Sequence, residues 1–368
     1  MRWDAQALSP NREPAPGDNG GKGPGSAPAL EALLPLAGLV RSVSTPEFSG
    51  VTFHEVTAKS VLNKVAAGSQ MPFEWTVNPY RGCSHACVYC FARKSHTYLE
   101  FDAGQDFDSQ VVVKINAAEV LRKELAKPSW ERHQVALGTN TDPYQRAEGR
   151  YALMPGIIGA LADSGTPFSI LTKGTLLARD IPLLKHAATQ VPVDLGISLA
   201  MTNQDLAAII EPGTPSPRAR LKLISRLRDA GLGCGVMAMP ILPWLTDSDE
   251  ALDALFSALT EAGATGVTAG ALYLKPGTRE WFMKWLAAHQ PELLGKYRRL
   301  YGQGSYASKE YRTWLAGRVS HFKAKYGYAG THGFSHRNAR PAAGRAIAHT
   351  AAPSHDESLV LPGQQPLF

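Results

Sequence analysis

Cysteine and long apolar runs are two things that this chain has little of. Only four of its 368 residues are cysteine, which excludes a disulfide-rich secreted scaffold. Asp, Lys, Gly or Pro interrupts every apolar run before it reaches the length that crosses a bilayer, so we expect no membrane association. Residues 1–28 are rich in Pro, Gly and Ala and lack the apolar segment of a signal peptide. We therefore expect a disordered N-terminal tail and a cytoplasmic protein.

Acidic residues are nearly missing between Lys296 and Arg345, where Glu310 is the only one. The same stretch holds further cations, namely Arg298, Arg299, Lys309, Arg312, Arg318, Lys323, Lys325, Arg337 and Arg340. Aromatic residues are interleaved with them: Tyr297, Tyr301, Tyr306, Tyr311, Trp314, Phe322, Tyr326, Tyr328 and Phe334. Cations that pair with phosphates beside rings that stack on bases are typical of a nucleic-acid-binding surface. A solvated helical face with an aromatic core stripe has the same composition, and both interpretations stay open.

Three of the four cysteines lie within eight residues, at Cys83, Cys87 and Cys90. The C-x3-C-x2-C spacing suits three corners of a [4Fe–4S] cluster and leaves one iron without a protein ligand. The alternative is a structural zinc site with His85 or His96 as its fourth ligand. Zinc ribbons usually pair two C-x2-C hairpins, and the sequence has no second one, so the iron–sulfur interpretation is favoured.

Strand-like and helix-like segments alternate through the middle of the chain. Buried or β-branched runs predict six strands, at 75–78, 134–138, 168–172, 191–199, 235–239 and 266–272. Helical periodicity and caps predict helices at 117–127, 155–163, 178–188, 216–230, 249–262 and 278–289, and a short apolar helix or docking segment at 29–40. This order indicates an α/β fold with a parallel sheet. An open doubly wound sheet and a partial barrel both fit.

Of the two architectures, we predict a partial (β/α)6 TIM-type barrel, with an N-terminal extension and a basic C-terminal region. The expected units are a tail at 1–28, the extension at 29–71, a core domain at 72–290, the basic aromatic region at 291–345 and a flexible tail at 346–368. Ligands bind at the carboxyl ends of the strands in such sheets. Polar segments follow those ends, at the cysteine loop, 139–142, Lys173, Ser198 and 244–247.

The cysteine motif, with Tyr89 before its last cysteine and a place after the first strand, resembles the signature of the radical S-adenosylmethionine (SAM) superfamily. The likeness runs from about Met71 to Trp285. Four segments resemble the spore photoproduct lyase-like branch: Asn78-Pro79-Tyr80-Arg81-Gly82-Cys83, Gly138-Thr139-Asn140-Thr141-Asp142-Pro143-Tyr144, Leu171-Thr172-Lys173 and Pro240-Ile241-Leu242-Pro243. The resemblance implies an enzyme that holds a [4Fe–4S] cluster and SAM as cofactors. It implies reductive cleavage of SAM to a 5′-deoxyadenosyl radical, which abstracts a hydrogen atom from a substrate.

The resemblance also implies residue roles. Tyr89 would contact the adenine side of SAM, and the Thr139–Asp142 loop would bind its methionine amino end through Asn140 or Asp142. Lys173 would pair with the methionine carboxylate, and Ser198 would bond to that carboxylate or to a ribose hydroxyl. A turn at Asp142 and a solvated strand end at Lys173 are the plain structural alternatives.

One departure limits the resemblance. The lyase has a hydrogen-donating cysteine near the end of its second strand, whereas this chain has Leu137-Gly138-Thr139-Asn140 there. The remaining thiol, Cys234, opens the fifth strand, on the wrong side for the site. Tyr144 and Tyr273 are candidate replacements. The catalytic residue and the reaction therefore stay open, and repair of a thymine dimer is not supported.

Three functions follow from these observations. The first is radical SAM chemistry on DNA or RNA, and the second is the same chemistry on a protein or a small molecule. The third is a zinc-bearing nucleic-acid-binding protein. One expected partner is a reducing electron donor of flavodoxin or ferredoxin type. The terminal Gln364-Gln365-Pro366-Leu367-Phe368 resembles the short peptides that dock in the groove of the bacterial sliding clamp, which makes the clamp a second expected partner, with a chance match as the alternative. A metal site at His332 and His336 is not favoured.

Overall fold

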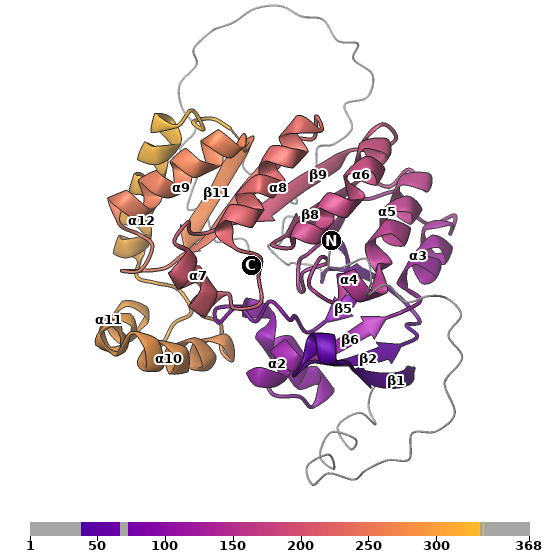
Figure 1. Cartoon of the computed structure of the whole chain (residues 1–368), viewed down its shortest axis with the longest axis horizontal. Coiled ribbons are helices and arrows are strands. Elements are labelled where there is room, and N and C mark those ends of the chain that lie inside the picture. The colour runs from indigo at the N-terminus through magenta and orange to yellow at the C-terminus, as the bar shows by residue number, and fades with distance from the viewer. Residues whose placement is uncertain (1–37, 67–72, 332–333, 335–368) are drawn as a thin grey trace, which may run out of the picture.

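The computed structural model describes residues 38–66, 73–331 and 334, and a seven-stranded sheet forms its centre (Figure 1). The strands follow one another across the sheet in the order β11-β10-β9-β8-β7-β4-β3. They are β3 (Leu62–Lys64), β4 (Trp75–Val77), β7 (Val135–Leu137), β8 (Phe168–Thr172), β9 (Val193–Ser198), β10 (Cys234–Ile241) and β11 (Gly266–Ala271). All six strands predicted from the sequence are present, and each is parallel to its predicted neighbours. The short β3 adds an antiparallel edge beside β4.

The order of the parallel strands decides between the two architectures that the sequence left open. From β4 to β11 each new strand is added beside the previous one, without the reversal that a doubly wound sheet requires. This is the winding of a β/α barrel. The edge strands β3 and β11 are not paired with each other within the described residues, so the barrel is partial, as expected.

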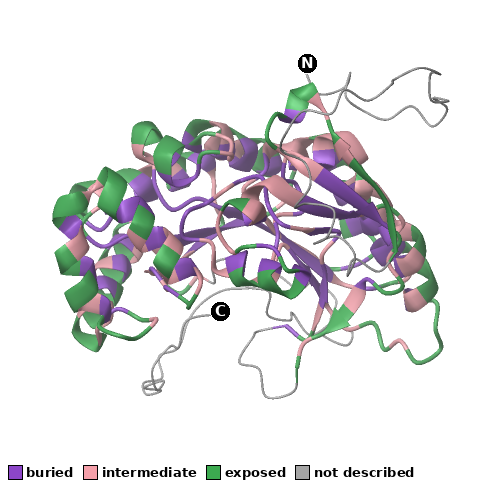
Figure 2. Ribbon diagram, turned by 90° about the horizontal axis from the view of Figure 1, so that it is seen from below, coloured by how far each residue is buried: buried purple, intermediate pink, exposed green. Residues whose placement is uncertain are grey.

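Helices cover one face of this sheet, and the buried side chains between them form the main core (Figures 1 and 2). Those helices are α3 (Ala117–Leu125), α5 (Leu153–Asp163), α6 (Ile181–Ala188), α8 (Pro217–Asp229) and α9 (Asp249–Ala262). Serine caps start two of them. Ser216 accepts a hydrogen bond from the Ala219 amide, and Ser248 accepts one from the Ala251 amide. The six helices predicted between 117 and 289 are confirmed, with 178–188 split into a 3-10 helix (Thr175–Asp180) and α6.

A second, smaller sheet was not predicted as such. Its order is β1 (Leu39–Ser44), β2 (Thr52–Val56), β6 (Gln110–Lys114) and β5 (Tyr80–Arg81), and β5 leads directly into the cysteine loop. Phe48, Phe53 and Val111 fill its core with their neighbours. The helix expected at 29–40 is wrong at its described end, because Leu39 and Val40 open strand β1, in which Leu39 pairs with Val56 of β2. The rest of that range lies outside the described residues.

Three helices complete the described chain: α10 (Thr278–His289), α11 (Pro291–Tyr301) and α12 (Lys309–Lys325). Tyr297 and Tyr301 of α11 pack with Phe282 and Trp285 of α10 in one cluster. Short helices lie between the larger elements, at α2 (Gln105–Ser109), α4 (Glu148–Tyr151), α7 (Gln204–Ile210), Pro46–Phe48 and Phe91–Leu99. Beyond α12, Phe334 packs against Met237 and Met239 of β10. The expected unit boundaries stay predictions, as do the tails at 1–28 and 346–368, which lie outside the described residues.

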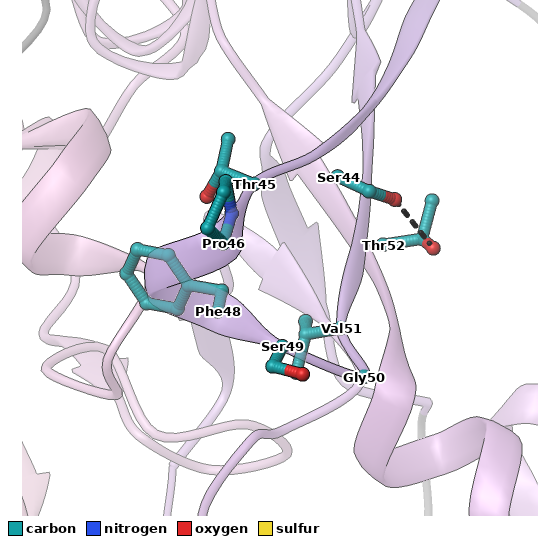
Figure 3. A pocket seen from close by; sticks show the side chains of 8 residues that line it. All are labelled: Ser44, Thr45, Pro46, Phe48, Ser49, Gly50, Val51 and Thr52. Atoms are coloured by element: carbon teal, nitrogen blue, oxygen red, sulfur yellow. Dashed lines mark hydrogen bonds between the residues drawn. The ribbon is translucent and has the colours of Figure 1, made fainter.

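A hollow lies in the loop between β1 and β2 (Figure 3). Its lining holds no cysteine, histidine or charged residue: Ser44, Thr45, Pro46, Phe48, Ser49, Gly50, Val51 and Thr52. The hydroxyl groups of Ser44 and Thr52 form a hydrogen bond with each other at 3.1 Å. Across the described part of the chain, no helix combines the length and the apolar character needed to cross a bilayer.

Candidate functional site

A cavity lies where the carboxyl ends of the parallel strands meet the cysteine loop. The loop contributes Cys83, Cys87, Tyr89 and Cys90 to its wall, and the turn after β7 contributes residues 138–142. Later strands add Lys173 after β8, Ser198 at the end of β9, Met237 and Met239 of β10, and Tyr273 beyond β11. Because parallel strands end at one edge, residues far apart in sequence share one wall.

All nine predicted site residues line this cavity: Cys83, Cys87, Tyr89, Cys90, Thr139, Asn140, Asp142, Lys173 and Ser198. The rim segment 244–247 does not, because Asp247 is buried under α12, where it accepts a hydrogen bond from the Tyr311 hydroxyl at 2.7 Å. Tyr144 also lies away from it and donates to Asp180 at 3.0 Å. Tyr273 is in the wall, whereas Cys234 is buried at the start of β10, at the opposite end of that strand. His332 and His336 lie outside the described residues.

The three loop cysteines are free thiols. Burial raises the pKa of the Cys90 thiol to about 11 and that of Cys87 well above its usual range. A metal that binds these sulfurs must therefore displace their protons.

Backbone contacts seat the loop from several sides. The Gln145 side chain accepts from the Ser84 amide and donates to the Gly82 carbonyl, both at 2.9 Å. Arg93, itself fully buried, donates to the Cys87 carbonyl at 2.9 Å. The Gly213 amide donates to the His85 carbonyl at 3.0 Å. Sequence reasoning missed these supporting residues, because each acts on main-chain atoms and has no motif of its own.

The two metal interpretations of the cysteine loop, a cluster and a single zinc ion, differ in how closely the ligand atoms must converge. Tetrahedral zinc needs four ligands within about 2.3 Å, so their atoms must converge. In the described residues no group of three His, Cys, Asp or Glu side chains converges in this way. Of the two expected fourth ligands, His96 bonds to the Gln110 carbonyl and lies outside the cavity wall, whereas His85 lines the cavity and places its Nδ1 3.3 Å from Asp142 Oδ2. A cubane, by contrast, takes each thiolate at a different iron, so its ligands stand further apart.

Lys173 directly follows β8 and belongs to a largely buried hydrogen-bond network. The network includes Glu211, a carboxylate that the sequence analysis missed. Its Nζ lies 2.8 Å from Ser198 Oγ, 3.1 Å from the Tyr89 hydroxyl and 3.0 Å from Glu211 Oε1. Glu211 follows α7, and its second oxygen accepts from Arg220 of α8 at 2.6 Å. Tyr89 also donates to Glu211.

Charge in this network is unbalanced. Burial alone raises the pKa of Glu211, but Arg220 and Lys173 outweigh it and hold that pKa well below the usual range. The carboxyl is therefore ionised, and two cations share one anion. The residual positive charge beside the cavity suits a carboxylate ligand.

Asp142 and Asn140 are the two candidates for binding an ammonium group. They differ in whether their side-chain oxygens already accept hydrogen bonds within the protein. Oδ1 of Asp142 accepts from the Tyr144 amide at 2.9 Å and the Thr172 hydroxyl at 2.5 Å, and Oδ2 accepts from the Lys173 amide at 2.6 Å. His85 faces the same Oδ2. Asp142 therefore fastens the end of β7 to the end of β8, and its role toward a ligand stays a prediction. No side-chain hydrogen bond involves Asn140 within the described chain, so its amide is available.

The family model described as the radical SAM superfamily matches residues 77–256 of this chain. Uncharacterized protein Rv2578c of Mycobacterium tuberculosis is 55% identical over the full length of both chains. Uncharacterized protein ORF301 of Acidianus two-tailed virus is 28% identical over 54% of this chain and 67% of its own.

Two solved structures of spore photoproduct lyase share the fold. The enzyme complexed with dinucleoside spore photoproduct has a TM-score of 0.56 and 15% identity, over 74% of this chain and 79% of its own. A doubly substituted mutant of that enzyme, with bound AdoMet and dinucleoside spore photoproduct, has a TM-score of 0.54 and 14% identity, over 72% and 76%. At such identities the likeness concerns the fold alone.

Proposed function

Since the chain belongs to the radical SAM superfamily of enzymes, we propose that Cys83, Cys87 and Cys90 hold a [4Fe–4S] cluster and that SAM binds beside it in the cavity. Such a cluster, once reduced, supplies the electron that cleaves SAM and so yields a 5′-deoxyadenosyl radical, which removes a hydrogen atom from a substrate. One observation carries the proposal. Three thiols from one loop and polar groups from successive strand ends line the same cavity.

The chain's own residues supply binding and orientation. Lys173 and Ser198 are suited to the methionine carboxylate, because the network behind them has an excess of positive charge. The free amide of Asn140 offers an oxygen to the ammonium group, and Thr139 lies next to it in the same wall. The buried Tyr89 ring lines the same cavity, with Lys173 Nζ 5.6 Å from its centre, and can border the adenine side. A reducing protein of flavodoxin or ferredoxin type would supply the electron.

Anaerobic reconstitution with iron and sulfide tests the proposal. The full-length protein should bind about four irons per chain and, when reduced with SAM, release 5′-deoxyadenosine. Cys87→Ala should lose both properties. Cys234→Ala is the matched control, because it removes a buried thiol outside the cavity and should keep both. Stoichiometric zinc with no iron, or a Cys87→Ala protein that behaves as wild type, contradicts the proposal.

A further inference from the structure

Three large aromatic residues are exposed: Trp244 after β10, Tyr306 between α11 and α12, and Trp314 in α12. Figure 1 shows both helices on the β11 side of the sheet. Trp244 is 44% exposed, Tyr306 40% and Trp314 45%, and we call these three residues the aromatic patch. A cation lies over each ring. Lys296 is 5.7 Å from the centre of Trp244, Arg312 is 5.6 Å from Tyr306, and Arg318 is 4.7 Å from Trp314. Each cation covers part of its ring and leaves the remainder to solvent.

The patch is held rigidly. Trp244 has φ +60°, which is an outlier for a bulky side chain, and Asp247 fixes it by accepting from the Trp244 amide at 2.9 Å. The other oxygen of Asp247 accepts from the Tyr311 hydroxyl of α12. The Tyr311 ring then joins the two tryptophans, at 6.5 Å from Trp244 and 5.4 Å from Trp314. Rigid, partly exposed rings lose little freedom when a flat ligand stacks on them.

The patch continues into the cavity. Tyr306 lies 4.6 Å from Tyr273, ring centre to ring centre, and Tyr273 is part of the cavity wall. Tyr273 and Tyr306 also form an antiparallel backbone bridge, and the Leu274 amide donates to the Ser305 carbonyl at 2.8 Å. A chain molecule lying on the patch can therefore reach the cavity across Tyr306.

Charge on α11 and α12 favours a polyanion. Between Pro291 and Lys325 there are two acidic residues, Glu292 and Glu310, and eight basic ones: Lys296, Arg298, Arg299, Lys309, Arg312, Arg318, Lys323 and Lys325. Arg318 pairs with Asp249, and Lys325 pairs with Asp253 at 2.5 Å. For the other six the described residues contain no ion pair. Tyr297, Tyr301 and Phe322 are buried, so the core-stripe interpretation holds for those rings but not for the patch.

We propose that the aromatic patch binds single-stranded nucleic acid. Bases stack on the open parts of Trp244, Tyr306 and Trp314, and phosphates pair with Lys296 and Arg312, the two ring cations that have no ion pair in the described residues. A single strand is favoured over a duplex because stacking on these rings needs bases that are not already stacked within a helix. Resting on the proposed function, this assignment names the substrate class: a nucleotide next to Tyr306 enters the cavity across Tyr273.

Fluorescence anisotropy with labelled single-stranded DNA and RNA oligonucleotides, on the reconstituted full-length protein, tests the assignment. Trp314→Ala and Tyr306→Ala should each weaken binding of at least one of the two strands about five- to a hundredfold. Arg312→Gln should weaken it and make its salt dependence less steep. Tyr98→Ala is the matched control, because Tyr98 is an exposed ring (81%) outside the patch, and it should bind as wild type.

Several results would overturn the assignment. They are no binding of either strand at low salt, equal binding by the patch variants and wild type, and tighter binding of duplex than of its single strands. Poly-glutamate that competes fully, with a loss in Arg312→Gln but none in Trp314→Ala, would indicate an acidic protein partner instead. If Trp314→Ala fails to fold, oligonucleotide binding by Trp314→Leu and Arg312→Gln tests the assignment instead, and both should bind more weakly than wild type.

Failure of this assignment remains distinct from failure of the proposed function. Release of 5′-deoxyadenosine from SAM alone reports the cluster site, and Trp314→Ala should leave it unchanged. Nucleic-acid binding that is intact in a Cys87→Ala protein reports the patch without the cluster.

Discussion

Lys173 Nζ and Glu211 Oε1 lie 3.0 Å apart, and this ion pair joins the end of β8 to the residue that follows α7. Thirty-eight positions separate them in sequence. The Glu211 side chain is buried and that of Lys173 is 13% exposed. Glu211 also accepts hydrogen bonds from Arg220 and Tyr89. One carboxylate therefore fixes the position of a lysine that faces the cavity.

Glu211→Gln should destabilise the protein strongly. The change keeps the shape of the side chain but leaves Lys173 and Arg220 buried without a counter-charge. Loss of one partner from a buried pair costs about 3–5 kcal/mol, so urea unfolding should show a drop of that order. The variant should also bind SAM more weakly, because Lys173 loses its fixed position.

The exposed Glu261→Gln in α9 is the control for this change, and its unfolding free energy should stay within about 0.5 kcal/mol of wild type. A Glu211→Gln protein that is equally unaffected would mean that the pair contributes nothing to stability.

Gly213→Ala should displace the cysteine loop. A Cβ at this position would lie 1.9 Å from the Ser84 carbonyl oxygen and 2.9 Å from the His85 Cα, both main-chain atoms that cannot turn aside. We expect a loss of about 1–3 kcal/mol in stability and lower iron loading on reconstitution. Gly159→Ala, in α5, meets nothing within 4 Å and should stabilise the protein by about 0.5–1 kcal/mol. Full iron loading by Gly213→Ala would show that the loop tolerates the shift.

The parallel sheet was predictable because its strands are buried on both faces and read as short apolar runs between helices. The cavity wall was predictable for a related reason, since polar residues that follow parallel strands meet at one edge. Residues Thr139, Lys173 and Ser198 all followed from that rule. The helix start at Ser216 followed from cap chemistry, which depends on neighbouring residues only.

The remainder depended on contacts that no local pattern encodes. Strand β5 has two residues and exists because β6 pairs with it. Glu211 gave one weak signal, a carboxylate that directly follows the apolar run Ala207–Ile210, but its partners come from three other segments. The basic C-terminal region was ambiguous because buried and exposed rings alternate in it. Burial separated Tyr297 from Trp314, and sequence spacing alone could not do so.

Asp142 and Asn140 should respond differently to substitution. Asp142→Asn removes a charge that faces His85 and accepts from Lys173, so it should lower stability by about 1.5–3 kcal/mol. Asn140→Ala breaks no hydrogen bond within the described chain and should leave stability unchanged while it raises the Kd for SAM roughly tenfold. Chemical unfolding and equilibrium dialysis with labelled SAM measure the two effects. The reverse outcome, with SAM affinity lost only in Asp142→Asn, would assign the ammonium contact to Asp142.

The stability of the smaller sheet should fall on acidification, because His96 is buried in its neutral form. Its Nε2 donates to the Gln110 carbonyl at 2.8 Å, and its buried Nδ1 has no partner in the described structure. Burial lowers the pKa of His96 from 6.5 to about 4. Between these values the unfolded chain binds a proton that the folded chain excludes, so stability is full above pH 6.5 and declines as the pH falls toward 4.

The loss due to His96 should reach about 3 kcal/mol across that range. Urea unfolding at a series of pH values measures it as a slope. His96→Gln should be less stable than wild type at neutral pH but should show a shallower decline.

Phe48→Leu, which loosens the same sheet without removing a titrating group, should lower stability by a similar amount at every pH and keep the wild-type slope. Because Asp108, with a pKa raised to about 6 chiefly by burial, works in the opposite direction, the difference between the two variants isolates His96. Equal slopes in wild type and His96→Gln would mean that the folded protein accepts the proton on this ring without penalty.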